Sequence, residues 1–245
     1  MKVSVVIAIL DSHEVVKRQI EHFKKMELDD DVEFIFVDDG SEPPLSGEMK
    51  NLTWYYTHDK RPWTQGLARN LGASKSKGKY LFFTDIDHII TREAIEAVRK
   101  FDGDKMVFRR FYGILDEDGN IVCDEKSMVD FGLEPLRVRT KRGYLCAGTH
   151  GNTYAIRKSI FDRIGGYDSR YCTTMFHRGG QYQSEESKFN SLCRVMVARG
   201  EIKDQAIGPK IYFYPVSKFR ADGDNNPFGL FHALSLEQVP QPMKR

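Results

Sequence analysis

The chain has 245 residues, of which 40% are hydrophobic and 29% charged, and its formal net charge is +2. This composition excludes a disordered chain, and the length suits one α/β domain with a large core. The nearly balanced charge excludes a strong overall attraction to nucleic acid or to an anionic membrane.

The cysteines and the apolar runs indicate the cellular compartment of the protein. The four cysteines, Cys123, Cys146, Cys172 and Cys193, form no C-x-x-C pair. Their spacing argues against a zinc site and favours reduced thiols. The apolar run over residues 3–10 is too short to span a bilayer and lacks a signal-peptide cleavage pattern. We therefore expect a cytoplasmic protein without a membrane-spanning segment.

The first half of the chain predicts strands that alternate with helices. Strands are predicted over residues 3–10, 32–37, 52–57 and 79–83, and helices after Asp11-Ser12 and over residues 64–74 and 92–101. Continuous β-branched runs are typical of parallel strands buried on both faces. Asp11-Ser12 is a predicted N-cap. The alternation predicts an α/β fold: a doubly wound, mostly parallel central sheet with helices on both faces.

The second half is less regular. It predicts strands over residues 106–115 and 153–156, a hairpin turn over 116–120, helices over 158–164 and 185–199, and a strand with a wrapping segment from Gly208 onward. Gly165 is expected to end the first of these helices. No repeat or linker divides the chain, so we expect a single domain over residues 1–245. Its expected parts are residues 1–101, 102–207 and 208–245.

Two carboxylates follow the strand predicted over residues 79–83, in the segment Thr84-Asp85-Ile86-Asp87-His88. Ligands of open α/β sheets bind at the carboxyl ends of strands. Two hard oxygen ligands there suit Mg²⁺ or Mn²⁺. The alternative is a solvated turn in which Asp85 caps the next helix.

Four pieces of sequence, in this order, resemble the GT-A fold nucleotide-sugar glycosyltransferases of family 2. They are Val3-Ser4-Val5-Val6-Ile7 with Val37-Asp38-Asp39-Gly40-Ser41; Ala68-Arg69-Asn70-Leu71-Gly72-Ala73 with Gly78 to Asp87; Arg157-Lys158-Ser159-Ile160-Phe161 with Ile164-Gly165-Gly166-Tyr167-Asp168; and Glu185-Glu186. The resemblance covers about residues 1 to 195.

The resemblance implies how a nucleotide sugar is bound. Asp39 would hydrogen-bond the base, which favours uracil, and Asp11 would lie in the loop that passes the nucleotide. Arg69 would approach the nucleotide or its phosphates as a cation, with an exposed helix arginine as the alternative. Asp85 would face the ribose and contribute to the metal site. Asp87 would ligate the Mn²⁺ or Mg²⁺ that bridges the diphosphate.

The resemblance also implies a catalytic carboxylate at the start of the late helix. Glu186 matches the family's base by position, and Glu185 is the alternative by one residue. Both glutamates could instead complement the helix macrodipole. Many members of the family supply a histidine as a third metal ligand in the region that corresponds to Ile211 to Tyr214. This segment contains no histidine, and the later His232 is not a convincing match. His88 is a second candidate ligand, although we expect it to cap a helix or be partly exposed.

Aromatic residues and a basic run are further candidates. The segment 143–152, with His150, resembles the loop that meets donor sugar and acceptor. Trp63, Tyr167 and Tyr171 could stack on sugars, with core packing as the default. The basic run 137–142 could contact a polyphosphate acceptor.

The sequence thus predicts a metal-dependent inverting glycosyltransferase. Its donor would be a nucleotide sugar, favouring UDP, and its acceptor a hydroxyl of a glycan or of a modified nucleobase in DNA. One alternative is a nucleotidyltransferase of similar fold, although the glycine-rich basic loop of those enzymes is missing after Leu10. The other is a non-catalytic sugar-nucleotide-binding module.

Overall fold

The computed structural model describes residues 1–61, 64–130, 139–140, 143–144, 146–172, 176–178 and 181–214. Four predictions fall wholly or mostly beyond these ranges: Trp63, the basic run 137–142, His232 and the wrapping segment after Tyr214. In the described part, no helix is both long enough and apolar enough to cross a membrane.

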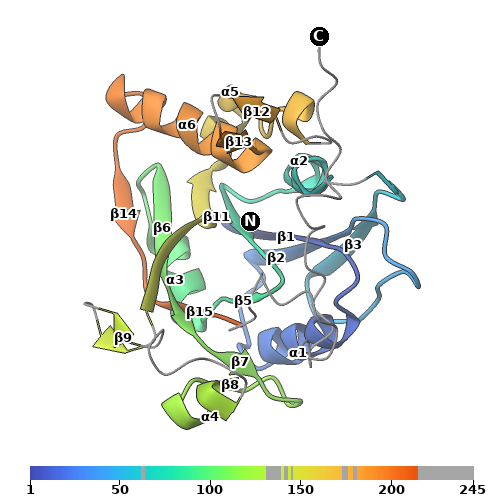
Figure 1. Ribbon diagram of the computed structural model, residues 1–245. Coiled ribbons are helices and arrows are strands. Elements are labelled where there is room, and N and C mark those ends of the chain that lie inside the picture. The colour runs from blue at the N-terminus through green and yellow to red at the C-terminus, as the bar shows by residue number, and fades with distance from the viewer. Residues whose placement is uncertain are drawn as a thin grey trace.

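A central sheet organises the chain (Figure 1). Its strands run in the order β3-β2-β1-β4-β11-β6-β15-β5, and β14 also pairs with β6. Their bounds are β1 Val3–Ile9, β2 Val32–Asp38, β3 Leu52–Tyr56, β4 Tyr80–Thr84, β5 His88–Ile89, β6 Lys105–Tyr112, β11 Cys146–Arg157, β14 Gln205–Ile207 and β15 Ile211–Phe213. Smaller pairs are β7 Ile114–Leu115 with β8 Ile121–Val122, β9 Arg139–Thr140 with β10 Gly143–Tyr144, and β12 Phe176–Arg178 with β13 Gln181–Gln183.

The sheet is mostly parallel, as predicted, with one antiparallel insertion. β3, β2, β1 and β4 are parallel neighbours, and β14 and β15 are parallel to β6. β11 lies antiparallel between β4 and β6, and β5 is antiparallel to β15. Strands β1, β2 and β4 are buried along nearly all of their length, which explains their continuous apolar runs. β11 therefore joins the two halves of the chain in one sheet.

Helices cover both faces of the sheet. They are α1 His13–Lys24, α2 Gln65–Lys75, α3 Arg92–Lys100, α4 Glu125–Asp130, α5 Lys158–Ile164 and α6 Glu185–Ala198, with a 3₁₀ turn at Ser169–Tyr171. One core packs α1 and α3 on one face, where alternate residues of β1 such as Val5 and Ile7 point. The other core packs α2, α5 and α6 against Val6 and Ala8. These last three helices lie together at the top of Figure 1. The prediction of helices on both faces is confirmed.

The predicted N-cap of α1 is wrong. Ser12 adopts a left-handed backbone conformation and makes no side-chain cap bond; its hydroxyl instead donates to the carbonyl of Leu10 at 3.2 Å. The carboxylate of Asp11 accepts from the N–H of Glu42 at 3.3 Å, and the N–H of Asp11 donates to the hydroxyl of Ser41 at 2.7 Å. Asp11 thus ties the end of β1 to the loop after β2, while Ser12 closes the turn locally on Leu10.

Candidate active site

The parallel strands β1, β2 and β4 deliver acidic residues to one edge of the sheet. Asp11 follows β1, Asp39 follows β2 and Asp85 follows β4. Because parallel strands end at the same edge, these carboxylates gather at the edge where such sheets bind ligands. The N–H of Asp39 donates to the carbonyl of Ile9 at 2.7 Å, which joins the first two strand ends directly.

Asp39 is buried, with 6% of its surface exposed. Its carboxylate accepts hydrogen bonds from the hydroxyls of Thr57 at 2.9 Å and Thr64 at 2.7 Å. Burial raises the pKa of Asp39 to about 6, although the two hydroxyl donors lower it. Such a carboxyl group is costly to keep charged in the folded state.

The turn-capping role belongs to the neighbouring Asp38. Its carboxylate oxygens accept from the backbone N–H groups of Ser41 and Leu45, each at 2.8 Å. Asp38 therefore holds the loop after β2, whereas the carboxylate of Asp39 accepts from side-chain hydroxyls.

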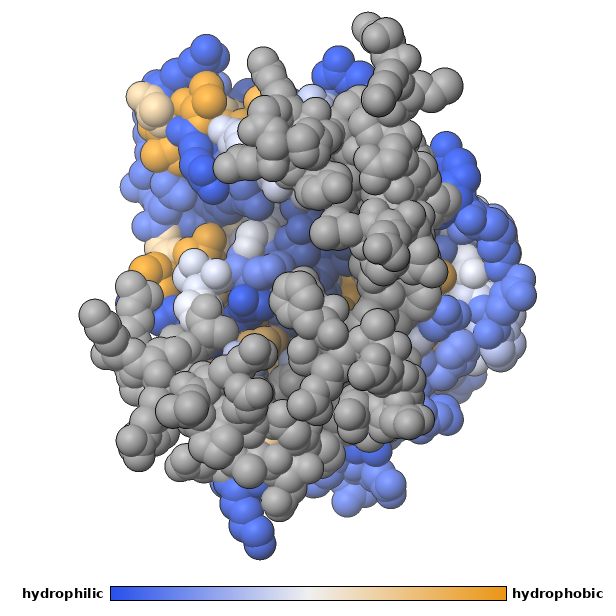
Figure 2. All heavy atoms as spheres, viewed as in Figure 1, coloured by the Kyte–Doolittle hydropathy of each residue, from blue (hydrophilic) through white to orange (hydrophobic). Residues whose placement is uncertain are grey.

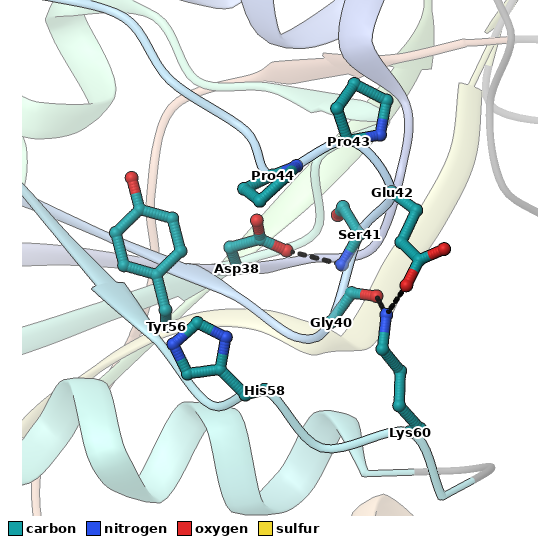
Figure 3. A pocket seen from close by; sticks show the side chains of 9 residues that line it. All are labelled: Asp38, Gly40, Ser41, Glu42, Pro43, Pro44, Tyr56, His58 and Lys60. Carbon is teal, nitrogen blue, oxygen red and sulfur yellow. Dashed lines mark hydrogen bonds and ion pairs between the residues drawn. The ribbon is translucent and has the colours of Figure 1, made fainter.

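A cavity of about 420 Å³ lies beside this loop (Figure 3). Lys60 closes one side by donating to Glu42 at 2.6 Å and to the carbonyl of Gly40 at 2.9 Å. The rings of Tyr56 and His58 are stacked on the other side, with their centroids 6.0 Å apart. Aromatic rings and an exposed ion pair thus border a space that Asp38, the neighbour of Asp39, also lines.

Arg69 lies at the centre of the site. Its side chain is 1% exposed, so the alternative of an exposed helix arginine is wrong. One terminal nitrogen forms an ion pair with Asp85, and the other lies 3.3 Å from the carboxylate of Glu186. One buried guanidinium therefore holds together the end of β4 and the start of α6.

Asp85 is fixed by several donors besides Arg69. The amide groups of Gln65 and Asn152 donate to its two oxygens at 3.0 Å and 3.1 Å. Burial raises the pKa of Asp85, but the charge of Arg69 outweighs that effect and holds the pKa below its usual range. Asp85 does not cap the next helix, because the hydroxyl of Thr91 caps α3 instead.

The two glutamates of α6 differ in exposure. Glu185 is 1% exposed, and a Cβ atom added to Gly66 would lie 2.7 Å from its Cγ. Glu185 is thus packed against α2. The side chain of Glu186 is 23% exposed and lines a groove. The N-terminus of α6 is capped by the hydroxyl of Ser184. Of the two carboxylates, Glu186 is the one that a second substrate can reach.

Two histidines approach Asp85 from different strands. One ligand atom each from Asp85, His88 and His150 lie within 4.8 Å of one another. Bonds of about 2.0–2.2 Å to a shared ion allow ligand atoms up to about 4.4 Å apart, so a small closure would suffice. The register of β11 against β6 shifts between Thr149 and Tyr154. Such an irregularity re-aims side chains. His150 lies within it, and its ring centre is 5.6 Å from that of His88.

The sequence predicts that His88 caps a helix or is partly exposed, and this prediction is wrong. It lies in β5 and is 1% exposed. Its Nδ1 contacts the hydroxyl of Thr153, and its Nε2 lies 3.2 Å from a terminal nitrogen of Arg110. Burial lowers the pKa of Arg110, while the charges of Asp87 and Asp85 raise it.

Asp87 lies outside the group of three ligand atoms. Its backbone carbonyl accepts from the N–H of Tyr214 at 2.9 Å, and its charge acts on Arg110. Its role as a metal ligand therefore stays a prediction.

The aromatic candidates have mixed outcomes. Tyr167 is 2% exposed, and its hydroxyl pairs with that of Tyr154 at 2.8 Å, so it belongs to the core. Tyr171 is partly exposed, and the ammonium of Lys188 lies 5.8 Å from its ring centre. Sequence reasoning missed Gln65, Asn152 and Arg110, because single polar residues on helices and strands form no pattern.

The parallel half-sheet, the acidic strand ends and the mixed sheet beyond them are the features of a GT-A fold. The structure resembles that of S. aureus TarS 1–349, with a TM-score of 0.53 and 16% identity over 87% of this chain and 60% of that one. The complex of TarS 1–349 with UDP-GlcNAc gives a TM-score of 0.53 and 15% identity over 89% of this chain and 59% of that one. The mannosyltransferase PcManGT from Pyrobaculum calidifontis in complex with GDP-Man and Mn²⁺ gives a TM-score of 0.50 and 13% identity over 86% of this chain and 56% of that one.

The sequence itself shows the family. Residues 4–176 match the model of the family described as glycosyltransferase like family 2, and the chain belongs to this family. The glycosyltransferase GlyG of Streptococcus pneumoniae serotype 4 (strain ATCC BAA-334 / TIGR4) is 30% identical over 147 residues. This alignment includes 56% of the chain and 48% of GlyG, so the chain spans about half the length of that relative.

Proposed function

We propose that the protein is a metal-dependent inverting glycosyltransferase that uses a nucleotide sugar. The observation that carries this proposal is the buried Arg69, which pairs at once with Asp85 and Glu186. Asp85 is the carboxylate expected at the donor, and Glu186 is the one expected at the acceptor. The single side chain of Arg69 contacts both. The family match favours this function over a nucleotidyltransferase.

The donor is proposed to be a UDP-sugar. Asp39, as a buried carboxylate at the end of β2, can accept the N3–H of uracil. The structures of TarS with UDP and with UDP-GlcNAc support this choice. A carboxylate can also accept from guanine, and PcManGT was solved with GDP-Man. UDP and GDP are therefore the two nucleotides to compare.

Asp85, His88 and His150 would hold the metal ion, with Asp87 as a further candidate ligand. The ion would neutralise charge that develops on the departing nucleoside diphosphate. Imidazole ligands suit Mn²⁺ better than Mg²⁺, which prefers oxygen ligands and several waters. The Mn²⁺ in the PcManGT complex agrees with this preference.

Glu186 would act as the base. The acceptor oxygen forms a bond to the anomeric carbon while the bond from that carbon to the phosphate oxygen breaks. The acceptor proton passes to Glu186, and the electron pair leaves with the nucleoside diphosphate. Arg69 orients Glu186, and the buried Glu185 supports the start of α6.

A binding screen tests the donor and the metal together. We expect UDP-sugars with Mn²⁺ to raise the melting temperature of the protein by several degrees, because a ligand that binds only the folded state stabilises it. GDP-sugars should have a smaller effect, and EDTA should remove the gain. Release of UDP in the presence of acceptor then distinguishes an enzyme from a non-catalytic module. Equal shifts with and without Mn²⁺ would contradict the metal assignment.

Asp39→Asn should make the fold more stable while it weakens nucleotide binding. The folded state holds the proton of Asp39 up to about pH 6, whereas the ordinary pKa of the carboxyl is 3.8. The free energy of unfolding therefore falls as pH rises from 3.8 through about 6, because the charged carboxylate destabilises the fold. The loss of stability is complete above pH 6. At pH 7.5 the variant should be more stable than wild type by about 1–3 kcal/mol, with no gain near pH 4.

The same variant should bind UDP at least tenfold more weakly at pH 7.5, since an amide is a poorer acceptor than a carboxylate. Wild-type affinity for UDP should itself fall as pH drops below about 6. Urea unfolding and calorimetric titration at both pH values measure the two effects. Unchanged UDP affinity would leave Asp39 without a role in base recognition.

A further inference from the structure

A groove of about 750 Å³ leads away from the candidate base along α6. One wall is the face of α6 that carries Glu186, Asn190 and Arg194, and the opposite wall comes from β6, β14 and β11. Glu186 and Arg194 are separated by eight helical steps, or about 12 Å. Figure 2 shows hydrophilic side chains in a hollow at the centre of this face. The groove is long enough for more than one sugar ring.

A buried lysine lines this groove. Lys105, at the start of β6, is 6% exposed. Its ammonium lies 4.8 Å from the ring centre of Tyr154 and 6.0 Å from that of Phe189. Its ammonium also hydrogen-bonds the neutral thiol of Cys193. Among the described residues, none of the ion pairs includes Lys105. The adjacent Asp104 is already engaged by Arg157 at 3.4 Å and by the N–H of Lys203 at 2.9 Å.

A buried ammonium without a carboxylate is costly, and aromatic faces recover only part of its lost hydration. An anion that enters the groove would complete this site. The protein does not supply that anion in its described part, because the acidic residue in the groove wall, Glu186, is paired with Arg69. The missing charge is thus expected from a ligand.

The rest of the wall suits a sugar. The side chains of Ser187, Asn190, Ser191 and Gln205 offer hydrogen-bond donors and acceptors for hydroxyl groups. The exposed Arg194 adds a second cation toward the end of the groove farthest from Glu186. The groove therefore has a basic side, with Lys105 and Arg194, and an end that carries the candidate base Glu186, so a bound ligand would be oriented in it.

We infer that this groove binds an acceptor sugar that carries an anionic group, a carboxylate or a phosphate, which pairs with Lys105. The hydroxyl that receives the new glycosyl unit then lies at the Glu186 end. This inference rests on the proposed function, since it names the class of acceptor for that same reaction.

Binding of matched sugars to the full chain tests the inference without any turnover. The probes are glucose, glucuronate and glucose 6-phosphate, titrated by NMR into protein saturated with UDP and Mn²⁺. We expect one of the two anionic sugars to bind at least tenfold more tightly than glucose. The stronger of the two identifies carboxylate or phosphate as the preferred group. Equal affinities for all three sugars would overturn the inference.

Three variants assign the effect to residues. Lys105→Met keeps most of the length of the side chain and removes its charge, and should abolish the preference for the anionic sugar. Arg194→Met, at an exposed position that does not threaten folding, should reduce it two- to fivefold. Arg199→Met is the matched control, because Arg199 directly follows the same helix as its C-cap residue, its side chain is 71% exposed, and it does not line the groove. It should change nothing.

The affinity for UDP separates this inference from the proposed function. All three variants should bind UDP as wild type does, because none of these residues lies at the strand ends that carry Asp39 and Asp85. A preference that persists in both Lys105→Met and Arg194→Met overturns the inference while the donor site stands. Failure of wild type to bind UDP or UDP-sugars would instead refute the proposed function.

Discussion

Asp85→Asn is expected to reduce glycosyl transfer by roughly three orders of magnitude. The change removes the charge that Arg69 pairs with and weakens a proposed metal ligand, while the size and shape of the side chain are kept. Loss of metal-assisted charge stabilisation is worth several kcal/mol, and each 1.36 kcal/mol is about tenfold in rate. Initial rates over a range of Mn²⁺ concentrations measure the effect, and the affinity for Mn²⁺ should fall in parallel.

The control for this experiment is Asp102→Asn. Asp102 is an exposed carboxylate that, in the described part of the chain, pairs with Lys79 and Arg157, and its loss should leave the rate and the Mn²⁺ dependence unchanged. Asp87→Asn, measured alongside, shows whether the second carboxylate of the motif joins the metal site. A fully active Asp85→Asn protein, or wild-type transfer that survives EDTA, would refute the metal centre.

Glu186→Gln is expected to lower transfer by roughly two to four orders of magnitude. The amide keeps an oxygen that can accept from Arg69, which lies 3.3 Å from the carboxylate, but it takes up no proton from an acceptor hydroxyl. Donor binding should survive, because Asp39 and Asp85 remain. Single-turnover transfer with saturating donor isolates the chemical step from binding.

Glu185→Gln is the matched comparison, one residue away on the same helix. Because Glu185 is buried, this change should alter stability more than the rate of transfer. If Glu185→Gln loses transfer while it stays folded, the base is Glu185 and the positional match is off by one residue. If both variants transfer sugar normally, an inverting mechanism with a carboxylate base at this helix is refuted.

The local elements could be predicted because their signals lie within a few residues of one another. The β-branched run of β1 and the apolar run of β4 predict strands buried on both faces, and both are found. α5 has the predicted bounds, because Gly165 adopts the left-handed conformation that ends it. The order of the four family-like pieces of sequence also predicted the family, because each piece is a short local pattern.

The composition of the site was decided by the tertiary structure. No local pattern indicates that Arg69 is fully buried, since burial depends on α6 and β4 packing around it. The same holds for His150, which lies near His88 although the two residues are far apart in the chain; β11, which carries His150, is inserted between β4 and β6.

The sequence by itself therefore determined which carboxylates stand at strand and helix ends, because chain-local periodicity and turn chemistry place them there. The tertiary structure decided which cations and histidines those carboxylates meet, and which of Glu185 and Glu186 is open to a substrate. The physical reason is that such pairings join residues far apart in the chain. Their energies depend on burial and on packing across the sheet, which no window of neighbouring residues contains.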